Sequence, residues 1–336
     1  MRLKDIGEFG FIQRIRRGCL IRPERVVRGI GDDAAAFHTD GRRLSLVTTD
    51  LLVERVHFLR EVISGRDLGY KSLAVNLSDI AAMGGIAREA FVSLAIPEAC
   101  ELGYLDDFFE GVKELSARHA VNILGGDTTG SLQDLVISIT VYGEVPEMQL
   151  LTRDAARPGD VIFATGCLGD SRAGLHLILN HIPADTPQLK ALQAAHLHPE
   201  PHLAEGRLLA SVGGVHAAID VSDGLSSDLA HILEESKAGA RIRAEHLPIS
   251  ENLRHYCRRF ATSPLACALA GGEDYVLLVS AAADRAMEVS RAFETAFGRP
   301  LHAIGEITDS RSMELVGPDA AVSTIAPSGW DHFKRH

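Results

Sequence analysis

The feature that most restricts the fold of this 336-residue chain is a set of aspartates beside glycine and hydroxyl residues in widely separated motifs. The motifs are GIGDD (29–33), TTD (48–50), NLSD (76–79), GGDTT (125–129), DVSDG (220–224) and, later, GGEDY (271–275). One such motif alone is typical of a turn or a helix cap. Their number instead predicts a fold that brings the carboxylates together in one cleft.

The candidate ligands in these motifs are Asp33, Asp50, Asp79, Asp127, Asp220 and Asp223. Two like charges 4 Å apart repel by about 4 kcal/mol at an effective dielectric of 20, so several carboxylates converge only around cations. Hard oxygen ligands beside threonine hydroxyls favour Mg²⁺ or Ca²⁺ over zinc. On a helix, Ser72, Asn76 and Asp79 form one polar stripe, which places Asp79 at the edge of an apolar face.

Hydrophobic patterns predict interleaved strands and helices without a strict β-α-β rhythm. Strands are expected over 44–49, with Asp50 at the end, and over 136–142. Helices are expected from Asp67, as the cap, to Met83, from Ser222, as the cap, to near Gly239, and over 289–297 with Gly298 as the stop. The polar segment 144–160 is the expected boundary between two domains of an α/β or α+β fold.

Composition excludes several function classes. The formal net charge of −11 argues against a nucleic-acid surface and against an anionic membrane surface. The N-terminal residues lack the apolar core of a signal peptide, and the most apolar stretch, 135–143, is too short to span a bilayer. The five scattered cysteines form no CxxC pair, which favours a reducing, cytoplasmic location.

Other known motifs fit the sequence less well than a metal site does. GIGDDA has the glycine spacing of a dinucleotide-binding turn, but its two aspartates would repel a bare pyrophosphate. No GxxxxGK[ST] loop occurs, and the calcium-loop pattern fails because the twelfth position from Asp220 is His231. HLHPEPH contains His196, His198 and His202, and its prolines predict a surface connection more than a transition-metal site.

Magnesium resolves the problem of how an acidic protein binds phosphates. Mg²⁺ would bridge the carboxylates to phosphate oxygens and neutralise the charge that develops during phosphoryl transfer. His57 and Arg153, which lie near these motifs, become candidate phosphate contacts.

The order and spacing of the motifs closely resemble those of the thiamine-monophosphate kinase family, whose superfamily includes aminoimidazole ribonucleotide synthetase, a hydrogenase-maturation factor and selenophosphate synthetase. The resemblance runs from EFGFIQRI (8–15) through KSLAVNLSDIAAMG (71–84) to GWDHF (329–333). It implies ATP-dependent phosphorylation of thiamine monophosphate to thiamine diphosphate, the final step of thiamine diphosphate biosynthesis, by direct in-line, Mg-assisted transfer. It also implies a homodimer. Residues 1–147 would form an ATP- and Mg-binding domain with a β-barrel across the two chains, and 148–336 a C-terminal α/β domain.

The resemblance also implies residue roles. Several Mg²⁺ ions would be held by Asp33, Thr48, Thr49, Asp50, Asp79, Asp127, Asp220 and Asp223, of which Asp50, Asp127 and Asp220 are the expected catalytic residues. ATP would contact Gly126, Asp127, Arg153 and Ser222, and thiamine phosphate would contact His57, Glu273 and Trp330. An aromatic face suits the cationic thiazolium, and Glu273 could complement either that ring or the aminopyrimidine. Taken by itself, Trp330 would equally suit an anchor for the C-terminal tail.

The chain departs from the family at HLHPEPH, where the family tends to carry HLRPxPR, so that His198 and His202 replace arginines. Among the sibling families, selenophosphate synthetases need a reactive cysteine in a glycine-rich N-terminal setting, which Cys19 lacks, and the hydrogenase-maturation factor needs a C-terminal cysteine. The alternatives that stay open are an aminoimidazole ribonucleotide synthetase-like enzyme and a non-catalytic divalent-metal or nucleotide-binding protein.

Overall fold

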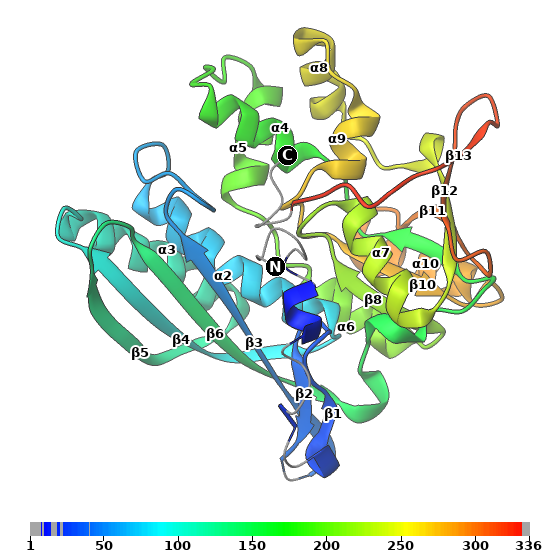
Figure 1. Ribbon diagram of the computed structural model, residues 1–336, viewed down its shortest axis with the longest axis horizontal. Coiled ribbons are helices and arrows are strands. Elements are labelled where there is room, and N and C mark those ends of the chain that lie inside the picture. Colours follow the sequence, from blue (N-terminus) through cyan, green and yellow to red (C-terminus); the bar gives the residue numbers. More distant parts are fainter. Residues whose placement is uncertain (1–7, 9, 15–18, 21–22, 40, 331–336) are drawn as a thin grey trace.

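The computed structural model describes all residues except 1–7, 9, 15–18, 21–22, 40 and 331–336, so EFGFIQRI and GWDHF lie partly outside the described residues. Two mixed sheets with helices packed on them form the fold (Figure 1). The strand order of the first sheet is β1 (Val26–Arg28), β2 (Ala35–His38), β3 (Arg43–Val53), β6 (Val136–Pro146), β4 (Ile86–Pro97) and β5 (Asn122–Ser131). Neighbouring strands in this sheet are antiparallel except for the parallel pair β4 and β5.

The second sheet is built from the C-terminal half. Its order is β13 (Val322–Thr324), β12 (Met313–Val316), β9 (Gly239–Arg243), β11 (His302–Thr308), β7 (Val161–Ala164), β10 (Leu277–Ala281) and β8 (Val215–Asp220). Its pairs are antiparallel except for β12 and β9. The expected mixed α/β class is therefore confirmed, while neither sheet closes into a barrel within the described part of this single chain.

Helices α2 (Gly65–Ala82) and α3 (Leu102–His119) cover one face of the first sheet (Figure 1). They approach closely at glycines: a Cβ at Gly69 would lie 1.9 Å from the carbonyl oxygen of Phe108. The helices of the second half are α4 (Asp170–Leu179), α5 (Pro187–Leu197), α6 (Leu203–Val212), α7 (Leu225–Ser236), α8 (Glu251–Phe260), α9 (Pro264–Ala270) and α10 (Ala286–Phe297). Short 3₁₀ turns are η1 (Pro23–Arg25), η2 (Glu147–Gln149), η3 (Arg153–Ala155) and η4 (Ala244–His246).

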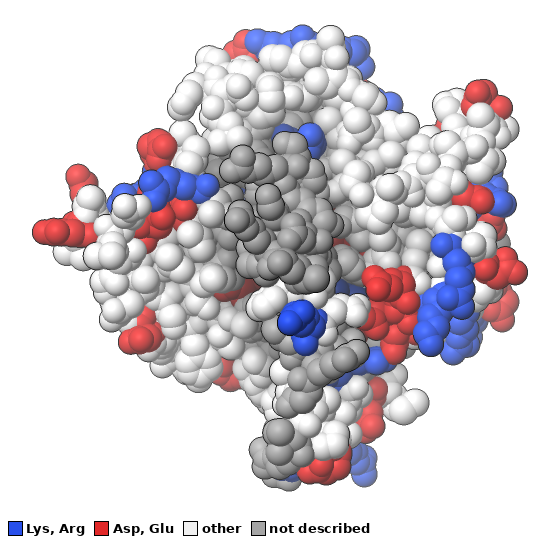
Figure 2. Space-filling model, in the orientation of Figure 1, with Lys and Arg blue, Asp and Glu red and all other residues white. Residues whose placement is uncertain are grey.

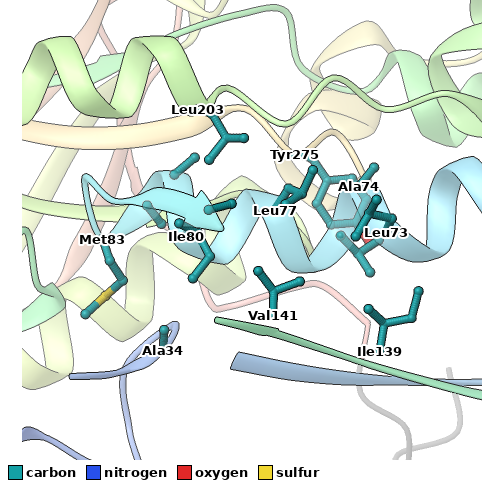
Figure 3. Close-up of a cluster of buried hydrophobic side chains, with 14 of the residues drawn as sticks. Ala34, Leu73, Ala74, Leu77, Ile80, Met83, Ile139, Val141, Leu203 and Tyr275 are labelled. Atoms are coloured by element: carbon teal, nitrogen blue, oxygen red, sulfur yellow. The ribbon is translucent and has the colours of Figure 1, made fainter. Parts of the chain in front are cut away.

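Helix α2 is buried between the two halves of the chain. Figure 3 shows its side chains packing against Ile139 and Val141 of β6 and, elsewhere on its surface, beside Leu203 of α6 and Tyr275. Every α2 residue except Arg66, Asp67 and Asp79 is buried. A helix that is buried all round is part of the core, so the polar residues on it must find partners inside the protein.

Several predicted boundaries need correction. Asp50 lies inside β3 instead of at its end, because β3 continues to Val53 opposite the long strand β6. The cap of α2 is Ser64, whose Oγ accepts from the backbone of Asp67 at 3.1 Å. Helix α7 begins after Gly224, so Ser222 is not its cap. The strand predicted over 136–142 and the helix that ends at Gly298 are confirmed.

Among the described residues, no strand or helix covers the opposite face of the first sheet or two of its strand edges. Strand β5 has no described neighbour on its outer side, and its residues are exposed apart from Ile123 and Ser131, which are half-buried. Strand β2 pairs only with residues 44–47 of β3, so the rest of that edge of β3 is also free among the described strands. On this open face Leu51 and Phe91 are 55% and 41% exposed. None of the described helices is long and apolar enough to cross a membrane.

Charged side chains of both signs are interspersed on the face of the molecule shown in Figure 2, in small groups without an extended basic surface among the described residues. Cys100, Cys167, Cys257 and Cys267 are free thiols, of which the last two are buried.

Candidate active site: a carboxylate cluster between the two sheets

Three carboxylates from distant parts of the chain meet where the two halves join. Asp33, Asp79 and Asp220 each offer an oxygen, and these oxygens lie within 4.8 Å of one another. Asp33 precedes β2, Asp79 lies in the last turn of α2, and Asp220 ends β8. The structure therefore brings together one aspartate from each of three predicted motifs.

Local structure fixes each of these carboxylates. The turn before β2 is stabilised by Asp32, whose Oδ1 accepts from the backbone N–H of Asp33 at 3.1 Å. Ser78 donates to Asp220 Oδ2 at 2.6 Å, which ties α2 to β8. Thr48 of β3 donates a short hydrogen bond to Asp79 Oδ2. The cluster is thus held by residues of both sheets and of the helix between them.

Arg153 is the cation that contacts the cluster directly. Its guanidinium forms a bidentate pair with Asp33, with Nη2 to Oδ1 at 2.5 Å and Nε to Oδ2 at 3.3 Å. Burial opposes its charge, but Asp33 and Asp32 together raise the pKa of Arg153. One arginine cannot balance the three carboxylates of the trio and the acids next to them, so the site keeps an excess of negative potential.

Burial raises the pKa of the clustered acids, and their mutual repulsion adds to the effect. The pKa of Asp220 rises to about 8 through burial and the charge of Asp33. The same causes raise the pKa of Asp50 to about 6. Burial and the charges of Asp50, Asp220 and Asp33 raise the pKa of Asp79 well above its usual range. These acids therefore resist ionisation until a cation approaches.

The donor set fits a magnesium ion. Apart from Arg153, the side chains described at the cluster offer carboxylate or hydroxyl oxygens, and Mg²⁺ prefers such hard ligands. Among the described residues, the one group of His, Cys, Asp or Glu side chains close enough to hold a metal is this trio. Asp50 lies near this trio. Its backbone N–H donates to Asn76 Oδ1 of α2 at 3.1 Å.

Strand register separates Thr49 and Asp127 from the cluster. Thr48 faces α2, so the next residue, Thr49, faces the open side of the sheet, where its Oγ1 lies 3.1 Å from that of Thr140. Asp127 is exposed on β5 and shares a row with Ser93, Ser138 and Leu51 on that same open side. Three strand steps put it about 14 Å from β3.

Gly126 precedes Asp127 on this edge strand. Its φ is 151°, and a Cβ there would lie 1.7 Å from the carbonyl oxygen of Val92, so no other residue fits without a shift of the strand. The predicted ATP contacts Gly126 and Asp127 thus share one exposed edge, far from Arg153 in the same chain.

A second group of predicted residues lies beside the cluster. Glu273 N–H donates to the carbonyl oxygen of Ser222 at 2.6 Å, and Trp330 N–H donates to that of Asp223 at 3.3 Å. GGEDY is a strained turn, because Glu273 and Tyr275 have φ values of 64° and 50°. Asp223 lies three residues beyond Asp220 and is not part of the close trio.

His57 has a defined tautomer in this arrangement. The backbone N–H of Val53 donates to its Nδ1 at 2.9 Å, so the ring proton is on Nε2. The backbone of Val53 thus fixes the orientation of the His57 ring. Trp330 is 50% exposed.

Sequence reasoning missed Lys71 and misjudged HLHPEPH. Lys71 lies on the buried helix α2, where its Nζ is 2.7 Å from Glu273 Oε1. His196 and His202 are buried and hydrogen-bonded, so the expected surface connection is wrong for these two. Only His198 is on the surface, where it pairs with Asp67 at 2.6 Å. The available signal was a lysine within an otherwise apolar helical pattern.

Comparisons with known proteins agree with this architecture. Two family models match, the AIR synthase related protein N-terminal domain over residues 31–145 and the AIR synthase related protein C-terminal domain over 157–317. The two matched domains identify the chain as an AIR synthase related protein.

Similarity over the full chain narrows this class. Thiamine-monophosphate kinase of Aquifex aeolicus is 36% identical over 333 residues, which cover 99% of this chain and 100% of that protein. The Bacillus subtilis thiamine-monophosphate kinase is 36% identical over 91% of this chain and 93% of its own length. A solved structure described as "AaThiL complexed with AMPPCP and TMP" superposes with a TM-score of 0.87 at 34% identity, covering 99% of both chains. The chain belongs to the thiamine-monophosphate kinase family.

The clustered carboxylates should make the metal-free protein less stable at higher pH. Because the folded pKa values of Asp79 and Asp220 are raised, the folded protein binds protons that the unfolded chain releases, and the free energy of unfolding falls as pH rises towards about 8. In EDTA, Asp79→Asn should therefore raise the melting temperature near pH 8 and weaken its pH dependence. The expected gain is about 1 kcal/mol or more. Thermal unfolding followed by circular dichroism measures both.

Asp106→Asn, on the exposed surface of α3, is the matched control and should leave both quantities unchanged. An Asp79→Asn variant that melts lower than the wild type in EDTA at every pH would contradict a repulsive cluster.

Proposed function

We propose that this protein is an ATP-dependent kinase that transfers a phosphoryl group to thiamine monophosphate and forms thiamine diphosphate and ADP. The observation that carries the proposal is the close trio Asp33, Asp79 and Asp220 with Arg153 beside it. Such a site has excess negative charge that Mg²⁺ would balance, and a metal-bound polyphosphate would then fit beside Arg153. Membership of the thiamine-monophosphate kinase family supplies the acceptor.

We assign roles to the residues as follows. Asp33, Asp50, Asp79 and Asp220, with Thr48 and Asp223, would hold Mg²⁺, which neutralises charge on the transferring phosphoryl group when bound. Arg153 and Ser222 would bind ATP phosphates and orient them for in-line transfer. His57, Glu273 and Trp330 would hold thiamine phosphate. A general base is not needed, because the acceptor phosphate is already nucleophilic, so positioning and charge stabilisation account for the rate.

The proposal is tested by product analysis. Purified protein given Mg²⁺, ATP and thiamine monophosphate should yield thiamine diphosphate and ADP in equal amounts, and EDTA should stop the reaction. Asp50→Asn should lower kcat by about 100-fold or more, because it removes a ligand from the charge-stabilising site. Asp106→Asn should be as active as the wild type. Mg-dependent ATP binding without any product would instead favour a nucleotide-binding protein and would overturn the kinase.

We further propose a cytoplasmic homodimer with domains at 1–147 and 148–336. Unpaired strand edges are a liability in a monomer. No other described strand pairs with the outer edge of β5 or with the far part of β3, and both edges lie beside the open face that exposes Leu51 and Phe91. If β5 of each chain meets the free edge of β3 in a second copy, the two sheets close into one barrel. Asp127 and Gly126 of one chain would then lie beside Thr49 and Asp50 of the other, which explains their distance from Arg153 within one chain.

Subunit complementation tests this arrangement. Asp127→Asn and Asp220→Asn should each be inactive alone, because each removes a carboxylate from every site. Mixed under conditions of subunit exchange, they should recover about a quarter of wild-type activity, since half of the dimers are mixed and each of these has one intact site. Recovery measured by thiamine diphosphate formation is the readout. A mixture that stays inactive although mass spectrometry detects mixed dimers would place Asp127 in its own chain's site.

A further inference from the structure

Lys71 is a buried cation that neither the metal site nor the proposed phosphate contacts use. Its side chain is 3% exposed, and its ammonium lies 2.7 Å from Glu273 Oε1 and 3.2 Å from His196 Nε2. These three residues come from α2, from the turn at 271–275 and from α5, so they join the two halves of the chain beside the carboxylate cluster. Burying a lysine ammonium is unfavourable unless it is hydrogen-bonded and paired with a carboxylate. We therefore expect the position of Lys71 to matter for function.

The protons in this triad can be assigned from donor and acceptor chemistry. An ammonium group only donates, so His196 Nε2 must accept from Lys71, and the imidazole proton is on Nδ1. Nδ1 lies 3.0 Å from Ser171 Oγ and 3.4 Å from Glu273 Oε2. Burial and the charge of Lys71 lower the pKa of His196 to about 4, so the ring is neutral at physiological pH. The triad of Lys71, His196 and Glu273 therefore carries no net charge.

The Glu273 carboxylate is fixed from several sides. Its backbone has a φ of 64° and donates to Ser222, while the adjacent Asp274 accepts from the backbone N–H groups of Gly169 and Ser171 at 2.6 and 3.2 Å. One carboxylate oxygen contacts Lys71 and the other lies near His196. The side chain is still 29% exposed. A carboxylate has about four acceptor positions, so some stay open to a ligand.

We propose that Lys71 and His196 are positioning residues, which hold Glu273 as a hydrogen-bond acceptor for the amino group of the aminopyrimidine of thiamine phosphate. Because Lys71 already neutralises this carboxylate, Glu273 does not act as the counter-ion of the thiazolium ring. The inference rests on the proposed function. A glutamate by itself could complement either the thiazolium ring or the aminopyrimidine, and the pairing with Lys71 favours the aminopyrimidine. The amino group of the aminopyrimidine, which is uncharged, would then determine specificity. A site whose buried acceptor pairs with an N–H group binds ligands without that group poorly.

The charged and titratable groups that face Glu273 are Lys71 from α2, His196 from α5, His57 from the turn after β3, and its neighbours Asp274 and Tyr275. Burial opposes ionisation of Glu273, but Lys71 and the two histidines together lower its pKa. Lys71 makes the largest contribution that lowers the pKa of Glu273, so its removal leaves burial less strongly opposed and raises that pKa. The acid limb of kcat/KM for thiamine phosphate should therefore move to higher pH in Lys71→Met.

The decisive experiment compares two substrates in wild-type protein and in Lys71→Met. One is thiamine phosphate, and the other is the phosphate ester of a 3-benzyl thiazolium, which keeps the positive ring and lacks the amino group. Lys71→Met should raise KM for thiamine phosphate by about tenfold or more, the effect of losing one hydrogen bond to a charged group. KM for the benzyl analogue and KM for ATP should stay within about twofold, a shift too small to signal a lost hydrogen bond.

A counter-ion role for Glu273 predicts the opposite sign. Lys71→Met would then uncover a negative charge, and KM would fall for both cationic substrates; this result would overturn the inference. Unchanged KM for thiamine phosphate together with an unmoved acid limb would also overturn it. Lys190→Met, exposed on α5, is the matched control and should behave as the wild type. Wild-type protein that does not phosphorylate thiamine phosphate would instead overturn the proposed function, and this inference with it.

A second variant guards against a folding defect. If Lys71→Met melts at a much lower temperature, the pair Lys71→Met with Glu273→Gln removes both buried charges and should restore folding. Its KM for thiamine phosphate should equal that of Glu273→Gln alone, because Lys71 acts only through Glu273. A double variant that is further impaired by another factor of ten would show that Lys71 has a separate role, and would overturn the inference.

Discussion

The burial of helix α2 on all sides is the constraint on which the rest of the structure depends. A buried helix has no water to satisfy its polar side chains, so each must find a partner in another element. Asn76 accepts from β3, Ser78 donates to Asp220 of β8, and Lys71 pairs with Glu273. The contacts that satisfy the helix are therefore the contacts that align the two halves of the chain, and the site forms where those halves meet.

Stability and function are opposed at this site. Burial and mutual repulsion raise the pKa values of Asp79 and Asp220, which means that the folded chain keeps carboxylates where their charge is unfavourable. Arg153 offsets part of this cost through its bidentate contact with Asp33. A cation and a metal-bound phosphate would offset the remainder, so ligand binding and folding stability are linked. A loss of folding stability of this kind is typical of functional sites, because activity requires charged groups that are unfavourable for packing.

The sequence was informative wherever local pattern decides structure. Alternation predicted β6, helical spacing predicted much of α2, and the repetition of aspartate motifs predicted that Asp33, Asp79 and Asp220 would meet. Strand register could not be predicted from the sequence. The face on which Asp127 lies depends on how β4 pairs with β6 and on a bulge between β4 and β5.

The burial of individual side chains in the tertiary structure could not be predicted from the sequence either. The prolines of HLHPEPH correctly indicate a connection, yet His196 lies in the last turn of α5 and is buried against α2 and α4. Lys71 could be noticed as a charge in an apolar helix, but its partner Glu273 lies about 200 residues away and only the fold reveals it.

We propose that the carboxylates at the junction of the two halves bind the metal ions that serve phosphoryl transfer. Anomalous diffraction from crystals grown with Mn²⁺, a non-hydrolysable ATP analogue and thiamine phosphate would locate these ions. We expect an anomalous peak bonded to oxygens of Asp33, Asp79 and Asp220 and to a phosphate oxygen of the nucleotide. Nucleotide and thiamine phosphate bound with no metal at these three carboxylates would contradict it.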